Sequence, residues 1–483
     1  MFIIDWKPNK SSPVPLHKQI TDFIKEKISN GEWTIGYRLP PQRTLAKALG
    51  VNRSTVVTAF DELIAEGLIE GKSGSGTRVV NNTWNLLATT PPPDWSSYVN
   101  FGIHKPNLPT IQEINQAEFT SNIIRLGTGE LSPDLIPSIS MKKVFNELSN
   151  RDISYGYEEP KGLLPLREQI ATYLNTIGIS ASPSSILIVS GALQALHLIS
   201  VGLLHKGSTV LTEKPSYLHS LNVFQSAGMR LVGIPMDKEG IQANHIPKYK
   251  KQHSAALLYT IPSFHNPTGT LMTVERRNQL FNICQQEQLP LIEDDVYREL
   301  WFDEYPPQPI KAFDKNGLVL YLGSLSKSLS PGLRIGWIVG PEPVVDHLAD
   351  IKMQTDYGSS SISQWAAVEW FSSGLYYKHL NEVRKQLKIR RDFTLDILNK
   401  YFSDIAVWEK PTGGFFIWLR LLPSLSIRKL FEIALKEGIL LNPGNVYDHQ
   451  AEQYLRISYS FASLTNIENG LRRLSKIVKS IAK

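Results

Sequence analysis

The stretch Ser324-Leu-Ser-Lys327-Ser-Leu-Ser-Pro-Gly-Leu-Arg334 places one lysine among small hydroxyl side chains, just before a Pro-Gly pair and an arginine. A lysine amine can form a Schiff base with the aldehyde of pyridoxal phosphate (PLP). The hydroxyls of Ser324 and Ser326 and the planar guanidinium of Arg334 suit a phosphate group. The stretch therefore predicts a PLP site centred on Lys327, although a single lysine is by default a surface residue.

Residues that would complete this site occur in order along the chain. Asp294 follows a predicted strand, where a carboxylate can pair with the protonated pyridine nitrogen. Tyr297 and Asn266 can hydrogen-bond the 3′-oxygen of the ring, and Tyr217 can stack on its face. Residues 190–194 join a predicted strand to a predicted helix, so their backbone N–H groups can hold a phosphate. Each feature is common by itself, and the prediction depends on their occurring together in this order.

Composition limits the class of protein. A chain of 483 residues is expected to form two or more domains, and 42% hydrophobic with 20% charged residues is typical of a soluble globular protein. No apolar run is long enough to span a membrane, and the N-terminus lacks the pattern of a secretory signal. The single cysteine, Cys284, agrees with a reducing cytoplasm. The net charge of +6 permits an acidic partner without identifying one.

Short apolar runs alternate with helical stretches from Ile123 onward, which is typical of an α/β fold with a mostly parallel sheet. These runs are residues 186–189, 209–211, 255–259, 290–293, 319–322 and 335–339.

The chain is predicted to have three parts. Residues 12–80 form an N-terminal domain, and residues 121–483 form the α/β domain. Residues 81–120 lack a sustained hydrophobic period and are predicted to be a linker. Prolines cluster at residues 89–94, which makes that stretch semi-rigid.

The N-terminal domain reads as helix, helix, tight turn, helix and hairpin. Helical spacing of apolar residues predicts helices at about 16–30, 43–50 and 53–66, with Asn52 as the N-cap of the third. Glycine-rich residues 71–76, between two β-like runs, predict a hairpin. This order is that of a winged helix-turn-helix. The side chains expected on the inner face of the third helix are Val56, Val57, Phe60, Leu63 and Ile64.

This pattern, from Pro15-Leu16 to Gly76-Thr77, resembles the GntR-type winged helix-turn-helix along its whole length. In such domains the first turn of the recognition helix enters the major groove of double-stranded DNA, which here is Arg53, Ser54 and Thr55. The resemblance implies that Arg43 and Arg53 contact DNA, and an arginine suits guanine and phosphate equally well. Three further basic residues are candidates for phosphate contacts or for a solvated face. They are Lys47, Lys72 and Arg78.

Residues 121–480 resemble the fold type I, class I aminotransferases, through the Lys327 motif, Asp294-x-x-Tyr297, Asn266-Pro-Thr-Gly and Tyr454-Leu-Arg456. The resemblance implies that Lys327 bonds to PLP, that Asp294 pairs with the ring nitrogen, and that Tyr297 and Asn266 bind the 3′-oxygen. Arg456 falls on the position that binds the substrate α-carboxylate. The resemblance also places Ser324, Ser326, Arg334, the backbone of Ala192 and Leu193 on the phosphate, and Gly129 near the substrate.

Two details qualify this resemblance. Tyr157 matches a tyrosine that reaches the phosphate of the partner subunit, which implies a homodimer. Many relatives have Ser-Gln where this chain has Ala192-Leu193, so one side-chain contact to the phosphate is missing. No residue set is assigned to a metal.

A GntR-type head joined through a linker to an aminotransferase-like domain is similar to the MocR subfamily of bacterial regulators. The resemblance implies a cytoplasmic, PLP-dependent transcriptional regulator that binds operator DNA and senses PLP, a small amino compound, or both. The alternative is an active class I aminotransferase with an accessory DNA-binding head, because Lys327, Asp294, Tyr297 and Arg456 are all present. A regulator that senses only the level of PLP is a third hypothesis. The sequence does not identify the effector, the operator or the sign of regulation.

Overall fold

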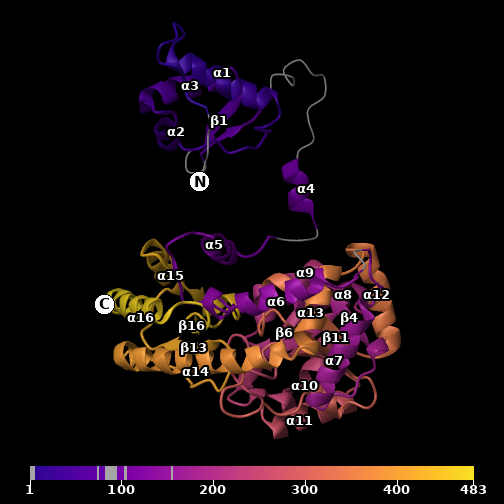
Figure 1. Ribbon diagram of the computed structural model, residues 1–483. Helices are drawn as coiled ribbons and strands as arrows, with labels where there is room; N and C mark the ends of the chain where they lie inside the picture. The colour runs from indigo at the N-terminus through magenta and orange to yellow at the C-terminus, as the bar shows by residue number, and fades with distance from the viewer. Residues whose placement is uncertain (1–5, 73–75, 82–94, 103–105, 154–155, 483) are drawn as a thin grey trace. The chain divides into compact units, whose positions relative to one another are not determined.

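A computed structural model describes residues 6–72, 76–81, 95–102, 106–153 and 156–482 (Figure 1). The chain divides into two compact units, Met1–Gly102 and Ile103–Lys483. Within the described residues, no helix combines the length and the apolar character needed to cross a membrane.

The smaller unit is a winged helix-turn-helix, which confirms that prediction. It consists of α1 (Leu16–Ser29), α2 (Gln42–Leu49), α3 (Arg53–Ala65), and a hairpin of β1 (Ile69–Lys72) and β2 (Gly76–Val79), followed by α4 (Trp95–Phe101). Gly50 ends α2 in the left-handed conformation, at φ 66°, which a residue without Cβ adopts at little cost. The turn between α2 and α3 depends on this glycine.

The core of the smaller unit differs slightly from the predicted inner face. Val56, Phe60 and Leu63 are buried as expected, and Val57 is half-buried. Ile64 is 45% exposed, and Ala59 is buried instead. Residue 64 lies just beyond the stripe of α3 that packs on the other helices. Asn52 does occupy the N-cap position, although its side chain makes no capping hydrogen bond.

The larger unit is built on an eight-stranded sheet in the order β4-β11-β10-β9-β8-β5-β6-β7. Its strands are β4 (Ile186–Val189), β5 (Thr209–Lys214), β6 (Arg230–Asp237), β7 (Gly240–Ile241), β8 (Ala255–Thr260), β9 (Leu291–Asp294), β10 (Val319–Ser324) and β11 (Gly336–Val339). The central neighbours pair in parallel, while β11 runs antiparallel to β4 and β10. The predicted α/β fold with a mostly parallel sheet is therefore confirmed.

Helices surround this sheet (Figure 1). They are α6 (Ser138–Ser149), α7 (Leu164–Thr176), α8 (Ala192–Gly202), α9 (Val223–Ser226), α10 (Ile246–His253), α11 (Val274–Gln286), α12 (Glu342–Thr355) and α13 (Ser361–Ser372). The strands β9 and β10 are buried along their whole length, so their carboxyl ends, at Asp294 and Ser324, are held rigidly by the core.

A smaller antiparallel sheet lies beside the long helix α14 (Leu375–Phe402) in Figure 1. It contains β12 (Ala406–Val407), β13 (Phe416–Leu421), β15 (Asn442–Pro443) and β16 (Tyr454–Ser458). The helices α15 (Ile427–Lys436) and α16 (Leu464–Ile481) accompany it, and β3 (Ile124–Arg125) pairs in parallel with β14 (Ile439–Leu440). This part of the fold brings Arg456, on β16, toward the main sheet.

Part of the predicted linker is helical. The helix α5 (Pro109–Ala117) begins with proline, which is favoured in a first turn, and buries Ile114 and Ala117. Its Glu113 forms an ion pair with Arg428 of α15, at 2.9 Å. The helix is therefore part of the larger compact unit.

Candidate functional site

A cavity of about 380 Å³ lies where the central strands of the main sheet end. This is the usual position of a ligand site in an open α/β sheet. The predicted site residues that line it are Gly129, Ala192, Leu193, Tyr217, Asn266, Asp294, Tyr297, Ser324, Ser326, Lys327, Arg334 and Arg456. They come from segments separated by more than 300 residues, so the fold alone brings them together.

Lys327 follows the carboxyl end of β10 by three residues and faces this cavity. Its Nζ donates a hydrogen bond to the carbonyl oxygen of Gly129, at 2.7 Å. Burial lowers the pKa of the Lys327 amine to about 8, against the opposing effect of the Glu130 carboxylate. About one tenth of the amine is therefore uncharged at pH 7, and this is the form that can attack an aldehyde.

Asp294 is the last residue of β9 and is almost completely buried. Its Oδ2 accepts a hydrogen bond from the Tyr259 hydroxyl, at 2.7 Å, while Oδ1 has no partner among the described residues. Burial raises the pKa of the Asp294 carboxyl to about 6, although the bond from Tyr259 and the nearby backbone N–H of Val296 both oppose this. A buried oxygen without a partner costs free energy unless a ligand supplies a donor.

Arg456 is oriented by three neighbours. It donates to Oδ1 of Asn266 at 2.8 Å and to the carbonyl oxygen of Gly127 at 2.7 Å, and its guanidinium lies 4.2 Å from the ring centroid of Phe416. Its Nε is buried without a partner among the described residues. Arg456 is thus a fixed cation with a free donor, as a carboxylate-binding residue requires.

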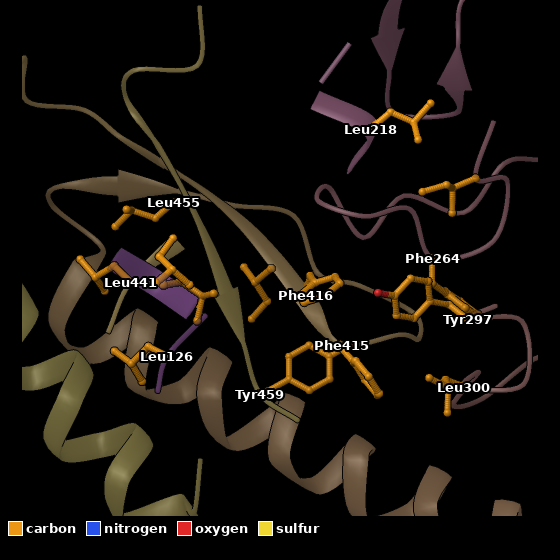
Figure 2. Close-up of a cluster of buried hydrophobic side chains, with 14 of the residues drawn as sticks. Leu126, Leu218, Phe264, Tyr297, Leu300, Phe415, Phe416, Leu441, Leu455 and Tyr459 are labelled. Carbon is orange, nitrogen blue, oxygen red and sulfur yellow. The ribbon is translucent and has the colours of Figure 1, made fainter. Parts of the chain in front are cut away.

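Tyr297 lies near Asn266, whose Nδ2 is 3.4 Å from the Tyr297 hydroxyl. Figure 2 shows the Tyr297 ring close to Phe415 and Phe416, and the ring centroids are 5.6 Å and 5.7 Å apart. Burial raises the pKa of the Tyr297 phenol far above its usual value, so the hydroxyl stays protonated and can donate. The aromatic packing fixes the position of that donor.

Ser324, Ser326 and Arg334 gather at one end of the cavity. The Ser324 hydroxyl lies 3.0 Å from that of Ser326, and Arg334 donates to the carbonyl oxygen of Ser190 at 2.5 Å. Gly191 has φ 87°, and a Cβ on it would lie 2.7 Å from Nη2 of Arg334. Only glycine therefore permits this close approach just before α8. The first N–H groups of α8 and one arginine together make a cradle for an anion.

These observations fit PLP. The partnerless oxygen of Asp294 suits a ring N–H, the glycine-lined cradle suits a phosphate, and the amine of Lys327 faces the same cavity. Leu193 is 48% exposed, and neither it nor Ala192 has a side chain that can bind phosphate, so only their backbone can contribute.

The structure adds residues to the cavity that sequence reasoning missed. Glu118 and Ile111 come from the α5 region, Glu130 follows Gly129, and Tyr447 and Asn442 precede β16. Helical spacing of Ile111, Ile114 and Ala117 after a proline was the available signal for α5. No sequence signal indicated that α5 would line the cavity.

Comparison with known proteins gives the family. Residues 121–474 match the family described as aminotransferase class I and II, and residues 16–79 match the gntR family of bacterial regulatory proteins. The uncharacterized HTH-type transcriptional regulator YdfD of Bacillus subtilis (strain 168) is 55% identical over 98% of this chain and 98% of its own length. The chain belongs to the MocR-type regulators of the GntR family.

Two further proteins are similar to this MocR-type chain, a second HTH-type transcriptional regulator and an aminotransferase. The HTH-type transcriptional regulator NorG of Staphylococcus aureus (strain N315) is 37% identical over 92% of this chain and 100% of its own. The structure of LysN, an α-aminoadipate aminotransferase from Thermus thermophilus complexed with N-(5′-phosphopyridoxyl)-L-leucine, has a TM-score of 0.73. It is 29% identical, and the match covers 80% of this chain and 99% of LysN.

Most of the predicted DNA-binding residues in the MocR-type head are exposed. Arg43, Arg53, Ser54, Lys47 and Arg78 are exposed. Thr55 is half-buried, and the side chain of Lys72 lies outside the described residues. The first turn of α3 therefore offers a cation and hydroxyl groups at its exposed surface.

Carboxylates on α3 are kept away from that first turn. The first turn contains no acidic residue. Further along, Glu62 accepts a hydrogen bond from Thr21 at 2.8 Å, and Glu66 pairs with Lys25 at 2.6 Å. These contacts tie the acidic end of α3 to α1 and leave the Arg53 end free of opposing charge.

Tyr157 is the one predicted cofactor residue outside the cavity of its own chain. Its side chain is 81% exposed, and its ring contacts that of Tyr357 with centroids 4.7 Å apart. The predicted role of Tyr157 on a partner subunit stays a prediction for this MocR-type chain.

Proposed function

We propose that this protein is a cytoplasmic PLP-dependent transcriptional regulator. Residues 12–80 would bind double-stranded operator DNA. Residues 81–120 would connect the parts, with α5 packed on the larger unit, and residues 121–483 together with α5 would bind PLP and a small amino effector. The observation that carries the proposal is the partnerless buried oxygen of Asp294 in the same cavity as Lys327. A buried carboxylate oxygen without a partner costs free energy, and a protonated ring nitrogen in this cavity would supply the missing donor.

The residues of the cavity have separate tasks in this proposal. Bound PLP supplies an aldehyde and an electron-withdrawing ring. Lys327 offers an amine with a pKa of about 8, and Asp294 retains a proton on the ring nitrogen. Tyr297 and Asn266 donate to the 3′-oxygen, and Tyr217 covers the ring.

The phosphate and the effector would lie at opposite ends. Ser324, Ser326, Arg334 and the backbone at the start of α8 would hold the phosphate, with Tyr157 of the neighbouring subunit in a homodimer. Arg456 would bind the effector carboxylate, close to the backbone of Gly129.

Regulation requires that effector binding changes DNA affinity. Operator titrations of the apo, PLP-loaded and amine-loaded protein, followed by fluorescence anisotropy, test this directly. We expect operator affinities that differ by about 1–3 kcal/mol between forms, with a reciprocal change in effector affinity when operator is present. A protein lacking residues 1–80 is the control and should not bind. Identical affinities in all three forms, together with steady keto-acid production, would indicate an aminotransferase instead.

A further inference from the structure

Two carboxylates, Glu118 and Glu130, line the same cavity as Lys327. Neither forms an ion pair with any cation in the described part of the chain. On the basis of the proposed function, we propose that the effector is an amino carboxylate whose side chain carries a second positive charge, which these two carboxylates bind. A short diamino acid is the simplest member of this class.

The charges of the cavity support this proposal. Its basic side chains are Lys327, Arg334 and Arg456. In the proposed function Arg334 serves the phosphate, Arg456 serves the effector carboxylate, and Lys327 bonds to the cofactor. The Asp294 carboxylate serves the ring nitrogen. Glu118 and Glu130 are the charges that remain, and both are half-buried in the cavity, where a cationic effector would supply their counter-charge.

Glu118 is positioned for such a role. It is the C-cap residue of α5, and its Oε1 accepts a hydrogen bond from the Thr128 hydroxyl at 2.8 Å. This bond orients the carboxylate and uses only part of its hydrogen-bonding capacity, because a carboxylate can accept several bonds.

Glu130 follows Gly129, whose carbonyl oxygen accepts the hydrogen bond from Lys327. The charges of both carboxylates reach the reactive end of the cavity, since Glu130 and, more weakly, Glu118 oppose the lowering of the Lys327 pKa. A cation on a short side chain would therefore meet both carboxylates while its α-amino group stays near Lys327.

Other side chains fit this end of the cavity poorly. A carboxylate on the effector would meet two like charges, which is repulsive. A purely apolar chain would displace water from two carboxylates without replacing its hydrogen bonds. The chemistry of this end of the cavity therefore selects a cationic side chain.

Isothermal titration calorimetry of the full-length, PLP-loaded protein would test the inference. The ligands are L-ornithine and L-lysine, L-norvaline and L-norleucine, which have matching side chains without the charged amine, and L-glutamate. We expect the diamino acids to bind roughly tenfold or more tightly than the uncharged pair, as for a charge-assisted hydrogen bond. L-Glutamate should bind most weakly.

Glu118→Gln and Glu130→Gln should each reduce the preference for a diamino acid severalfold. Glutamine at position 118 can still accept from Thr128, so the fold is preserved. Glu113→Gln is the matched control, because Glu113 lies on the same helix, pairs with Arg428 and does not line the cavity. It should keep the full preference.

Equal affinity for amino acids with cationic and with neutral side chains would overturn the inference. A preference for diamino acids that persists in both glutamine variants would also overturn it. If uncharged amino acids bind and still change operator affinity, the proposed function stands without this inference. If the protein does not take up PLP, the proposed function itself fails.

Discussion

Arg456 and Asn266 are joined by a hydrogen bond of 2.8 Å from Nη1 to Oδ1. One residue is the candidate contact for the effector carboxylate and the other for the 3′-oxygen of PLP. Because Asn266 accepts from Arg456 with its oxygen, its amide nitrogen is turned toward Tyr297. The Asn266 amide therefore contacts both Arg456, at the effector end of the cavity, and Tyr297, at the cofactor end.

Asn266→Ala should weaken effector binding even though Asn266 is assigned to the cofactor. Without its acceptor, Arg456 loses orientation, and we expect a loss of roughly 1–3 kcal/mol in effector affinity. Calorimetry on PLP-loaded protein measures this, with the exposed Asn282→Ala as control. Unchanged effector affinity in Asn266→Ala would show that the bond does not position Arg456.

Tyr259→Phe should move the pH dependence of PLP binding. The Tyr259 hydroxyl lowers the pKa of Asp294, which burial nevertheless raises to about 6. PLP binding needs the carboxylate, so affinity should fall as pH falls through about 6 in the wild type, and at higher pH in Tyr259→Phe. Asp294→Asn should bind PLP weakly at every pH, because an amide carries no charge to pair with a protonated ring. Absorbance titrations with PLP across pH measure this, and coincident profiles for wild type and Tyr259→Phe would contradict the assigned role of Tyr259.

Lys327→Met should abolish covalent attachment of PLP, which borohydride reduction and mass spectrometry would measure. The same substitution should stabilise the folded apo-protein. The Lys327 pKa falls from 10.5 to about 8 on folding, so the unfolded chain binds more protons between these values. Wild-type stability should therefore rise with pH across this window, and the penalty below pH 8 is about 3 kcal/mol.

Urea unfolding of the apo-protein should thus find Lys327→Met more stable at pH 7, with the difference shrinking toward pH 10.5. Exposed Lys429→Met serves as the control and should show no such trend. A parallel pH dependence for wild type and Lys327→Met would rule out this linkage.

Arg53→Ala should weaken operator binding by roughly 1–3 kcal/mol if Arg53 contacts a base. The residue is exposed at the start of α3, away from the carboxylates that α1 engages. Gel shifts at several salt concentrations also separate the two possible roles, because losing a phosphate contact reduces the magnitude of the salt slope by about 1. Lys18→Ala, on the exposed side of α1, is the control. Full operator affinity in Arg53→Ala would remove this residue from the interface.

Much of the cavity could be predicted because its residues lie in short motifs at strand ends. Asp294 and Lys327 follow runs of buried residues whose apolar character is visible in the sequence. Tyr259 could not be found in this way. It reaches Asp294 because β8 pairs with β9, and neither strand order nor register follows from the strands' own composition.

The contribution of α5 was missed for a different reason. Its helical spacing is visible, but it follows a long polar and proline-rich stretch that resembles a linker. Whether such a short amphipathic helix packs on a neighbouring domain depends on partners far away in sequence, such as Arg428. For the same reason the sequence did not predict that Glu118 lines the cavity.

The position of α5 limits how the protein can be divided into exchangeable modules. A chimaera that joins a foreign DNA-binding head after residue 120 would discard a wall of the cavity together with the native head. A junction placed before Pro106 would keep Ile111, Ile114 and Glu118 where they line it. Residues 106–120 should therefore contribute to ligand preference. Engineered sensors built from this chain should take these residues from the same parent protein as the larger unit.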